Sequence, residues 1–218
     1  MPARPHRDGN LPRGPAARYL AGMRAAFRLL LPTTLLLALS ACGASEHRLD
    51  SFDMEDLPVT AMFQQLSVGL DMPYVLEVPL RSSSPSFDVH LKNVTAREVL
   101  AELARRDPSY QCVRRGPVLM MWPTGSAEAA SPFSAKAVLE QPEGGVGEVL
   151  SRLMNESEQP AEIRAEKVVG RRAVKLGVQD ASVRDVLAQV AEQAHAAVSV
   201  QPGLVSVQPL KRGVDTTR

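Results

Sequence analysis

Side chains that commonly do chemistry are few after residue 42, and they do not stand at catalytic spacings. His47, His90 and His195 each lack a second histidine, a cysteine or a carboxylate at a metal-ligand spacing such as HxxxH or CxxC. The acidic run Asp53–Asp56 is interpreted as a solvated strand end rather than a pair of catalytic carboxylates facing one cleft. No GxSxG nucleophile motif occurs. We therefore expect no enzyme activity and no bound metal or cofactor.

Two further features could do chemistry but favour structural roles. The glycines of Glu143–Gly147 precede a predicted helix, as in a phosphate-binding loop, yet no Lys-Ser/Thr pair follows them. We interpret them as a flexible helix start. Cys112 is the only cysteine besides Cys42. It is interpreted as a small, partly buried strand residue without a disulfide partner, rather than a redox site.

Residues 23–42 have the features of an export signal. Two arginines precede an apolar run, Leu29–Leu39, which is too short for a membrane span of about 20 residues. Leu39–Cys42 resembles the lipobox of bacterial lipoproteins. The resemblance implies cleavage before Cys42 and attachment of lipid to its sulfur, so that the chain is held at a membrane. The alternatives are an ordinary cleaved signal with an incidental cysteine, and an uncleaved anchor.

The surroundings of Cys42 suggest an address within the cell envelope. Gly43 follows the cysteine, which resembles the outer-membrane rather than the inner-membrane sorting signal of enterobacterial lipoproteins. Residues 1–22 are rich in Pro, Arg and Gly and fit a signal poorly, which a translation start at Met23 would explain. We expect residues 1–41 to be a signal peptide, residues 42–46 a lipidated tether, and the mature chain to face the periplasm.

The charge of the chain gives no indication of a nucleic-acid partner. Its formal net charge is +1, but residues 1–42 hold six arginines and one aspartate, which leaves 19 basic and 23 acidic residues beyond them. Nucleic-acid binding usually needs a clustered basic face, and single-strand binding needs aromatic stacking platforms. With 4% aromatic residues the chain offers few. We expect no DNA or RNA partner.

One pattern occurs twice, 87 residues apart. Phe87–Leu103 first alternates apolar residues, as in a strand, and then spaces them as in a helix, and Val174–Val190 repeats this. The same offset maps Val59 onto Val146 and Val118 onto Val205. Duplication of one unit is the simplest explanation.

Each copy is predicted to have the element order βαββαββ. Thr95 with Glu98, and Ser182 with Asp185, stand at the spacing of a capping box before the second helix of each copy. Asp56 is expected to cap the first helix. In the second copy, strands are expected near residues 137–139 and at 174–178, and each copy should end in a hairpin, about Gly116 and Gly203.

The predicted fold is therefore α+β, with two tandem small domains after the signal peptide. The first domain is expected over residues 47–123 and the second over residues 133–210. A Pro/Ala/Ser-rich linker, residues 124–132, joins them. Residues 211–218 form a polar tail.

The repeat resembles the secretin and TonB N-terminus short (STN) domain. The residues that carry the resemblance are Asn93–Leu100, which open the second helix, Gly116–Met120 in the last hairpin, and Leu57–Val59 before the first helix. The second copy, with Gln179–Asp185 at the cap, fits less closely. These are mostly core and capping residues, so they specify fold more than function.

The resemblance implies a periplasmic protein-binding module rather than an enzyme. Such domains meet inner-membrane components of secretion or pilus machines in secretins, and signal to an anti-sigma regulator in TonB-dependent transducers. We expect an accessory lipoprotein whose partners are envelope proteins: secretin, pilus or TonB-system components. Two alternatives stay open, a small-molecule or peptidoglycan-binding periplasmic module and a structural spacer.

A difference between the copies suggests a partner-binding surface. Under the 87-residue offset, Leu119 and Met121 stand where the second copy has Ser206 and Gln208. This extra apolar face of the strand needs a cover. Either the linker or second copy covers it, or Leu119 and Met121 form a docking surface for a partner.

Overall fold

The structure is a computed structural model that describes residues 48–79, 85–125 and 131–210. These residues form a mixed α/β fold in which strands pair both parallel and antiparallel, in agreement with the predicted class. The predicted signal peptide, tether and tail lie outside the described residues. We call residues 48–125 the first half and residues 131–210 the second half.

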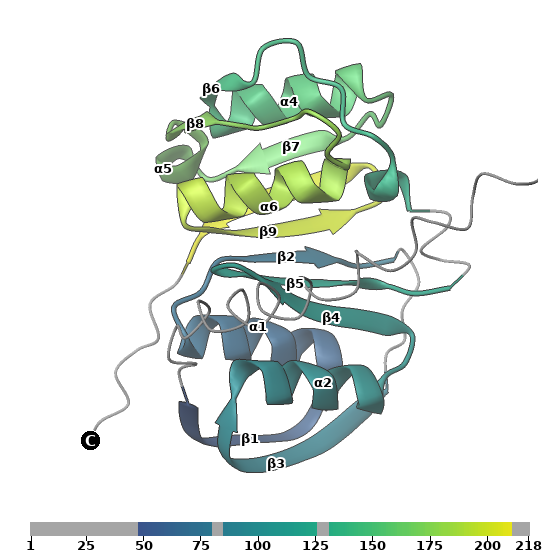
Figure 1. The fold of residues 1–218 in the computed structure, drawn as a ribbon, viewed down its shortest axis with the longest axis vertical. Helices are drawn as coiled ribbons and strands as arrows, with labels where there is room; N and C mark the ends of the chain where they lie inside the picture. The colour runs from purple at the N-terminus through teal and green to yellow at the C-terminus, as the bar shows by residue number, and fades with distance from the viewer. Residues whose placement is uncertain (1–47, 80–84, 126–130, 211–218) are drawn as a thin grey trace, which may run out of the picture. The chain divides into compact units, whose positions relative to one another are not determined.

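The first half has the element order βαββαββ. Its elements are β1 (Arg48–Pro58), α1 (Val59–Gly69), β2 (Tyr74–Glu77), β3 (Ser86–Thr95), α2 (Ala96–Arg106), β4 (Tyr110–Arg115) and β5 (Val118–Pro123). β1 and β3 pair as an antiparallel ribbon, and α1 and α2 lie between this ribbon and the strands β4, β5 and β2 (Figure 1). Phe63, Leu66, Val99 and Leu103 fill this layer and are at most 1% exposed.

The second half follows the same order with two added short helices. Its elements are the short helix η1 (Pro132–Ser134), β6 (Glu143–Gly145), α4 (Val146–Glu156), β7 (Glu162–Ala165), α5 (Lys167–Gly170), β8 (Ala173–Lys175), α6 (Val183–Ala194), β9 (Ala196–Gln201) and β10 (Leu204–Pro209). The prediction of a strand near residues 137–139 is wrong, because no strand forms there. β8 pairs instead with β6, at the glycines that precede α4. The strand expected at 174–178 ends at Lys175.

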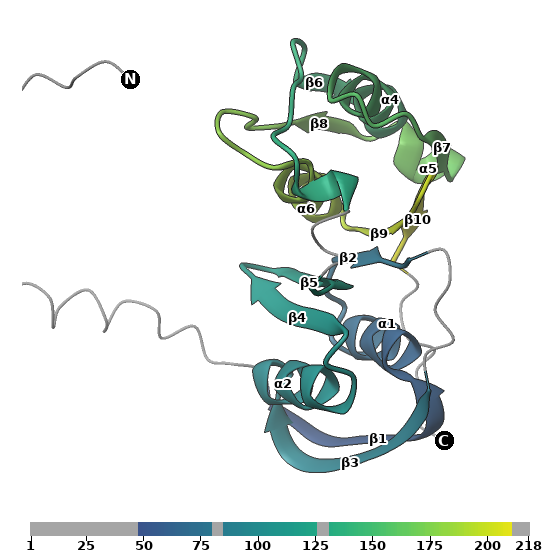
Figure 2. The ribbon, with the colours of Figure 1, turned by 90° about the vertical axis from the view of Figure 1, so that its right-hand side faces the viewer.

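Both halves contribute to one six-stranded sheet, in the order β4-β5-β2-β9-β10-β7. β2 runs parallel to β9, with Tyr74 opposite Ala197 and Glu77 opposite Val200. α1 and α2 lie on one face of this sheet, and α4 and α6 lie on the other (Figures 1 and 2). The division into two tandem domains stays a prediction, because the halves meet within a sheet rather than through a linker alone.

Helix starts follow the predicted caps with one exception. The Glu98 side chain accepts a hydrogen bond from the Thr95 backbone N–H at 2.7 Å, and the Thr95 hydroxyl accepts one from the Glu98 N–H at 3.2 Å. The reciprocal pair at the start of α6 is present as well. Asp56 does not cap α1. It lies in β1 with φ +48°, at an irregularity in the pairing with β3, and α1 begins only after Pro58.

The 87-residue offset fails at the last hairpin of each half. β4 begins at Tyr110 and β9 at Ala196, a difference of 86 residues. The cause is the connection to the preceding helix. His195 has left-handed backbone dihedrals, φ 44° and ψ 62°, and turns the chain into β9 directly after α6, whereas residues 107–109 separate α2 from β4. Because side chains alternate across a strand, a shift of one residue exchanges the two faces of the hairpin.

Candidate functional site

The structure does not bring together the residues that the sequence analysis singled out. Cys42 lies outside the described residues. Leu119 and Met121 lie on β5 and are 0% and 1% exposed, so the expected docking surface is not present at these positions. The one-residue shift gives them the core positions that Val205 and Val207 hold in β10, and they pack against α1 and α2.

The extra apolar face of β5 exists, but other residues form it. Val118, Met120 and Trp122 point to the face opposite α1 and α2, where they join the core of the second half. The corresponding face of β10, which points away from the helices of its own half, carries Ser206 and Gln208, and these are half-buried and exposed. The first half therefore offers an apolar sheet face, and the second half covers it.

A buried ion pair lies at the junction of the two halves. Arg184 donates from Nε to Oε1 of Glu77 at 2.5 Å and from Nη2 to Oε2 at 3.2 Å. The two side chains are 11% and 5% exposed. The Ser131 hydroxyl donates to Glu77 Oε2 at 2.9 Å, and the guanidinium carbon of Arg184 lies 4.6 Å from the ring centroid of Trp122. Each of these contacts joins the first half to the second.

Secondary structure holds both charges in place. Glu77 is the last residue of β2, opposite Val200 of β9, so strand pairing fixes its position. Arg184 is the second residue of α6, directly after the capping box of Ser182 and Asp185. The Asp185 carboxylate also accepts from Arg115 of β4, a second ion pair between the halves.

α6 buries two of its faces. One carries the apolar stripe of its own half, and the other carries Arg184, Ala188 and Ala191, which are 9%, 6% and 0% exposed. This second face packs toward β2 and β5 of the first half. Small side chains let a helix approach a sheet closely, and the arginine supplies the specific contact. We call these three residues the α6 docking face.

The junction has the properties of a recognition contact rather than a reactive site. A buried pair of this kind gains little stability over an apolar pair, because the two charges must lose their water. A strand lacking the carboxylate would leave a buried guanidinium poorly compensated, so pairing with such a strand would be disfavoured. Parallel strand pairing joins the backbones, and the Glu77–Arg184 contact is made in the register that places Glu77 opposite Val200.

Two histidines form further ion pairs, His90 with Asp53 within the first half and His195 with Asp71 between the halves, near the starts of β2 and β9. His90 Nδ1 is 3.0 Å from Asp53 Oδ1, and His195 Nε2 is 3.3 Å from Asp71 Oδ1, with all four side chains more than half exposed. Within the part of the chain that the structure describes, no three His, Cys, Asp or Glu side chains gather as a metal site would require. Burial raises the pKa of the Cys112 thiol to about 12, which keeps it protonated.

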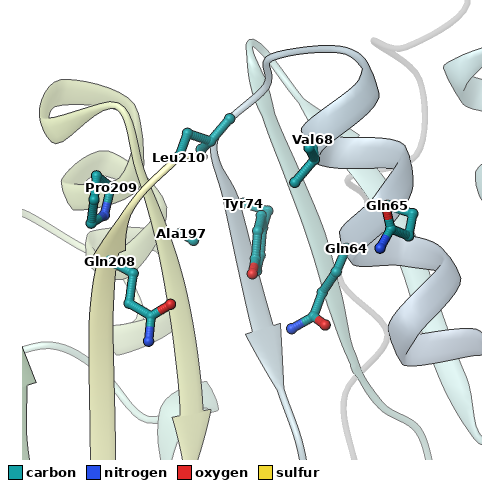
Figure 3. A pocket seen from close by; sticks show the side chains of 8 residues that line it. All are labelled: Gln64, Gln65, Val68, Tyr74, Ala197, Gln208, Pro209 and Leu210. Atoms are coloured by element: carbon teal, nitrogen blue, oxygen red, sulfur yellow. The ribbon is translucent and has the colours of Figure 1, made fainter. Parts of the chain in front are cut away.

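A pocket of about 280 Å³ lies beside the junction, on the face of the sheet that α1 covers in part (Figure 3). Gln64 of α1 and Gln208 of β10 stand on either side of Tyr74. Burial raises the pKa of Tyr74, whose hydroxyl hydrogen-bonds with the side chains of Gln64 and Ser199. The complete lining is Gln64, Gln65, Val68, Tyr74, Ala197, Gln208, Pro209 and Leu210.

Sequence reasoning missed the junction, although a signal was present. Glu77 is the one charged residue within the apolar run Tyr74–Val78. A charge inside a strand that is otherwise buried needs a partner. Nothing in the local sequence shows that this partner is Arg184, which lies 107 residues later.

In comparisons with known proteins, no family model, no curated protein and no solved structure matches the chain. Of the helices in the described ranges, none has the length and apolar character needed to cross a membrane.

Proposed function

We propose that this protein is a lipoprotein, anchored through Cys42 and facing the periplasm, that works as a protein–protein interaction module. Its partners would be envelope proteins, as an accessory to a secretin-type secretion or pilus system or to TonB-type signalling. The lipobox-like residues Leu39–Cys42 and the resemblance of Asn93–Leu100 to STN domains support this assignment. The outer membrane is the expected site of anchoring.

The observation that carries the proposal is the way the two halves bind each other. β2 and β9 pair as parallel strands, and the Glu77–Arg184 ion pair fixes their register. Each half thus recognises the sheet edge of another unit of its own kind. In strand addition, backbone hydrogen bonds supply affinity and side chains supply specificity. β4 and β7 end the six-stranded sheet, each with one strand neighbour among the described residues.

Photo-crosslinking from the sheet edge in the source bacterium tests this function. A photoreactive amino acid at Gln111, an exposed residue of β4, should crosslink to a secretin, pilus or TonB-system component. The same residue at Val138, which is 49% exposed and away from the six-stranded sheet, serves as the control. If neither position crosslinks to such a component, the proposal is wrong. If no protein at all is crosslinked, a structural spacer is favoured.

The pocket at Tyr74 favours a second candidate, a module that binds a small polar ligand such as a peptidoglycan fragment. Ligand sites are concave and contain a few converging polar groups, and glutamine amides from both halves meet here. Calorimetric titration of the full chain with soluble muropeptides tests this. Saturable binding that Gln64→Ala weakens at least tenfold would support the pocket, and no binding would exclude it.

A further inference from the structure

α2 carries the same residue types as the α6 docking face at the equivalent positions, but in α2 these residues are not buried. Arg97, Ala101 and Ala104 stand 87 residues before the three residues of that face. Arg97 and Ala101 are exposed and Ala104 is half-buried. α2 therefore resembles α6 not only in its buried apolar stripe but also in residues that its own core does not require. One arginine and two alanines recur at the spacing with which α6 covers the first half.

The strand beside α2, β4, is also equivalent to the strand beside α6, β9. β4 corresponds to β9 and contacts α2 as β9 contacts α6. β9 pairs with β2 on its outer side, whereas β4 lies at the end of the sheet. We call Arg97, Ala101 and Ala104 together with the outer edge of β4 the α2/β4 surface.

The charge of the α2/β4 surface indicates what it would accept. Arg114 of β4 takes the position of Val200, which faces Glu77 in the occupied junction. Arg114 is exposed and donates from Nε to the Gly116 carbonyl at 3.0 Å. A carboxylate placed here as Glu77 is placed on β9 would lie near both Arg97 and Arg114. Two guanidinium groups then replace the single one of the junction.

We propose that the α2/β4 surface binds a strand of another protein, parallel to β4, that places a carboxylate near Arg97 and Arg114. The strand would carry apolar residues on the side that α2 covers, as β2 carries Val75 beside Glu77. This inference rests on the proposed interaction function and names the surface and the chemistry of its partner. The template is the junction within this chain.

A second copy of the chain fits this surface poorly. The free edge of a second copy would be β7, which pairs with β10 as β2 pairs with β5. By this correspondence Arg164 replaces Val75, and Ser206 replaces Met120. α2 would then cover a positive charge and a hydroxyl where α6 covers apolar side chains. The occupant is therefore a different protein with an apolar and acidic sheet edge.

The probe for this proposal is the strand that the equivalent surface already binds. A fluorescein-labelled peptide of residues 72–79, MPYVLEVP, is titrated with the full chain in detergent, and anisotropy is measured. We expect saturable binding that Arg97→Glu weakens at least tenfold. A peptide with lysine in place of its glutamate should recover affinity for that variant. Ala101→Arg should block binding without a change of helix cap, and Lys92→Glu on β3 is the charge-matched control.

The outcomes separate this inference from the proposed function. No saturable binding, or equal binding by the wild type, Arg97→Glu and Ala101→Arg, would overturn the α2/β4 assignment. Crosslinks to envelope proteins from other positions would still support the interaction module. Concentration-dependent self-association, measured by sedimentation and abolished by both Arg97→Glu and Glu166→Lys, would show that the occupant is a second copy and that the assignment to another protein is wrong.

Discussion

Glu77 and Arg184 form an ion pair that is largely removed from water, so single substitutions there should be costly. Glu77→Gln keeps the size of the side chain but removes the charge that compensates the guanidinium. We expect a loss of about 3–5 kcal/mol in the free energy of unfolding, measured by urea denaturation. The double variant Glu77→Leu with Arg184→Met should be more stable than Glu77→Gln, since it buries no charge. If the double variant lost as much stability as Glu77→Leu and Arg184→Met lose in sum, the two side chains would contribute independently of each other.

Cys112 should be unreactive in the folded protein. Burial raises its pKa from 9.0 to about 12, and only the thiolate is a strong nucleophile, so we expect alkylation about 1000-fold slower than in the unfolded chain. The measurement is the rate of iodoacetamide labelling near neutral pH for the Cys42→Ser chain, with and without denaturant. Equal rates in the two conditions would show that Cys112 is accessible and ionised in the folded state.

Glu102 should make stability depend on pH in the acid range. Hydrogen bonds from Arg105 and Arg106 lower its pKa from 4.5 to about 2. A lowered pKa stabilises the folded state fully above the unfolded value, and this contribution is lost as pH falls from 4.5 towards 2. Glu102→Gln should therefore be less stable than the wild type near neutral pH, by under about 1 kcal/mol because the pairs are partly exposed. Urea unfolding near pH 7 and near pH 2 checks this, with the difference vanishing at the lower pH.

Helices and caps were the elements that the sequence predicted best. Their signals are local: the capping boxes at Thr95 and Ser182 and the helical spacing of apolar residues determine where α2 and α6 begin. Strand register was harder to predict, because it depends on connection length. α6 is one residue longer than α2, and one left-handed residue, His195, follows it where three residues follow α2, so the hairpin moves by one position. The docking surface expected at Leu119 followed from that error.

The corrected register of β5 predicts a large effect for a core substitution. Leu119 is fully buried between β5 and the helices of the first half, so Leu119→Ala should lower the free energy of unfolding by about 2–5 kcal/mol through lost burial and the cavity left behind. Val168→Ala is the control, since Val168 is 70% exposed. Urea denaturation of the two variants gives the comparison. If Leu119→Ala hardly changed the free energy of unfolding but abolished partner binding, the prediction that Leu119 belongs to a docking surface would be supported instead.

The union of the halves could not be read from the sequence. The repeat predicts two similar units but says nothing about their contact, because backbone groups make most of a strand-to-strand joint and every residue has them. The side chains that select the joint, Glu77 and Arg184, are far apart in the chain. Apolar residues on both faces of β5 are the clearest sequence sign that this strand is covered on two sides.

A shared sheet predicts that the halves unfold together. Trp122 is the only tryptophan of the chain and lies at the junction, against Arg184, so its fluorescence reports the joint, while far-ultraviolet circular dichroism reports the helices of both halves. Coincident urea transitions by the two probes are expected for one cooperative unit. In Glu77→Gln both transitions should move together to lower urea, because the core of the second half includes Val118, Met120 and Trp122 of the first. Separate transitions already in the wild type would mean that the halves fold as independent domains and that the β2–β9 pairing is a weak contact between them.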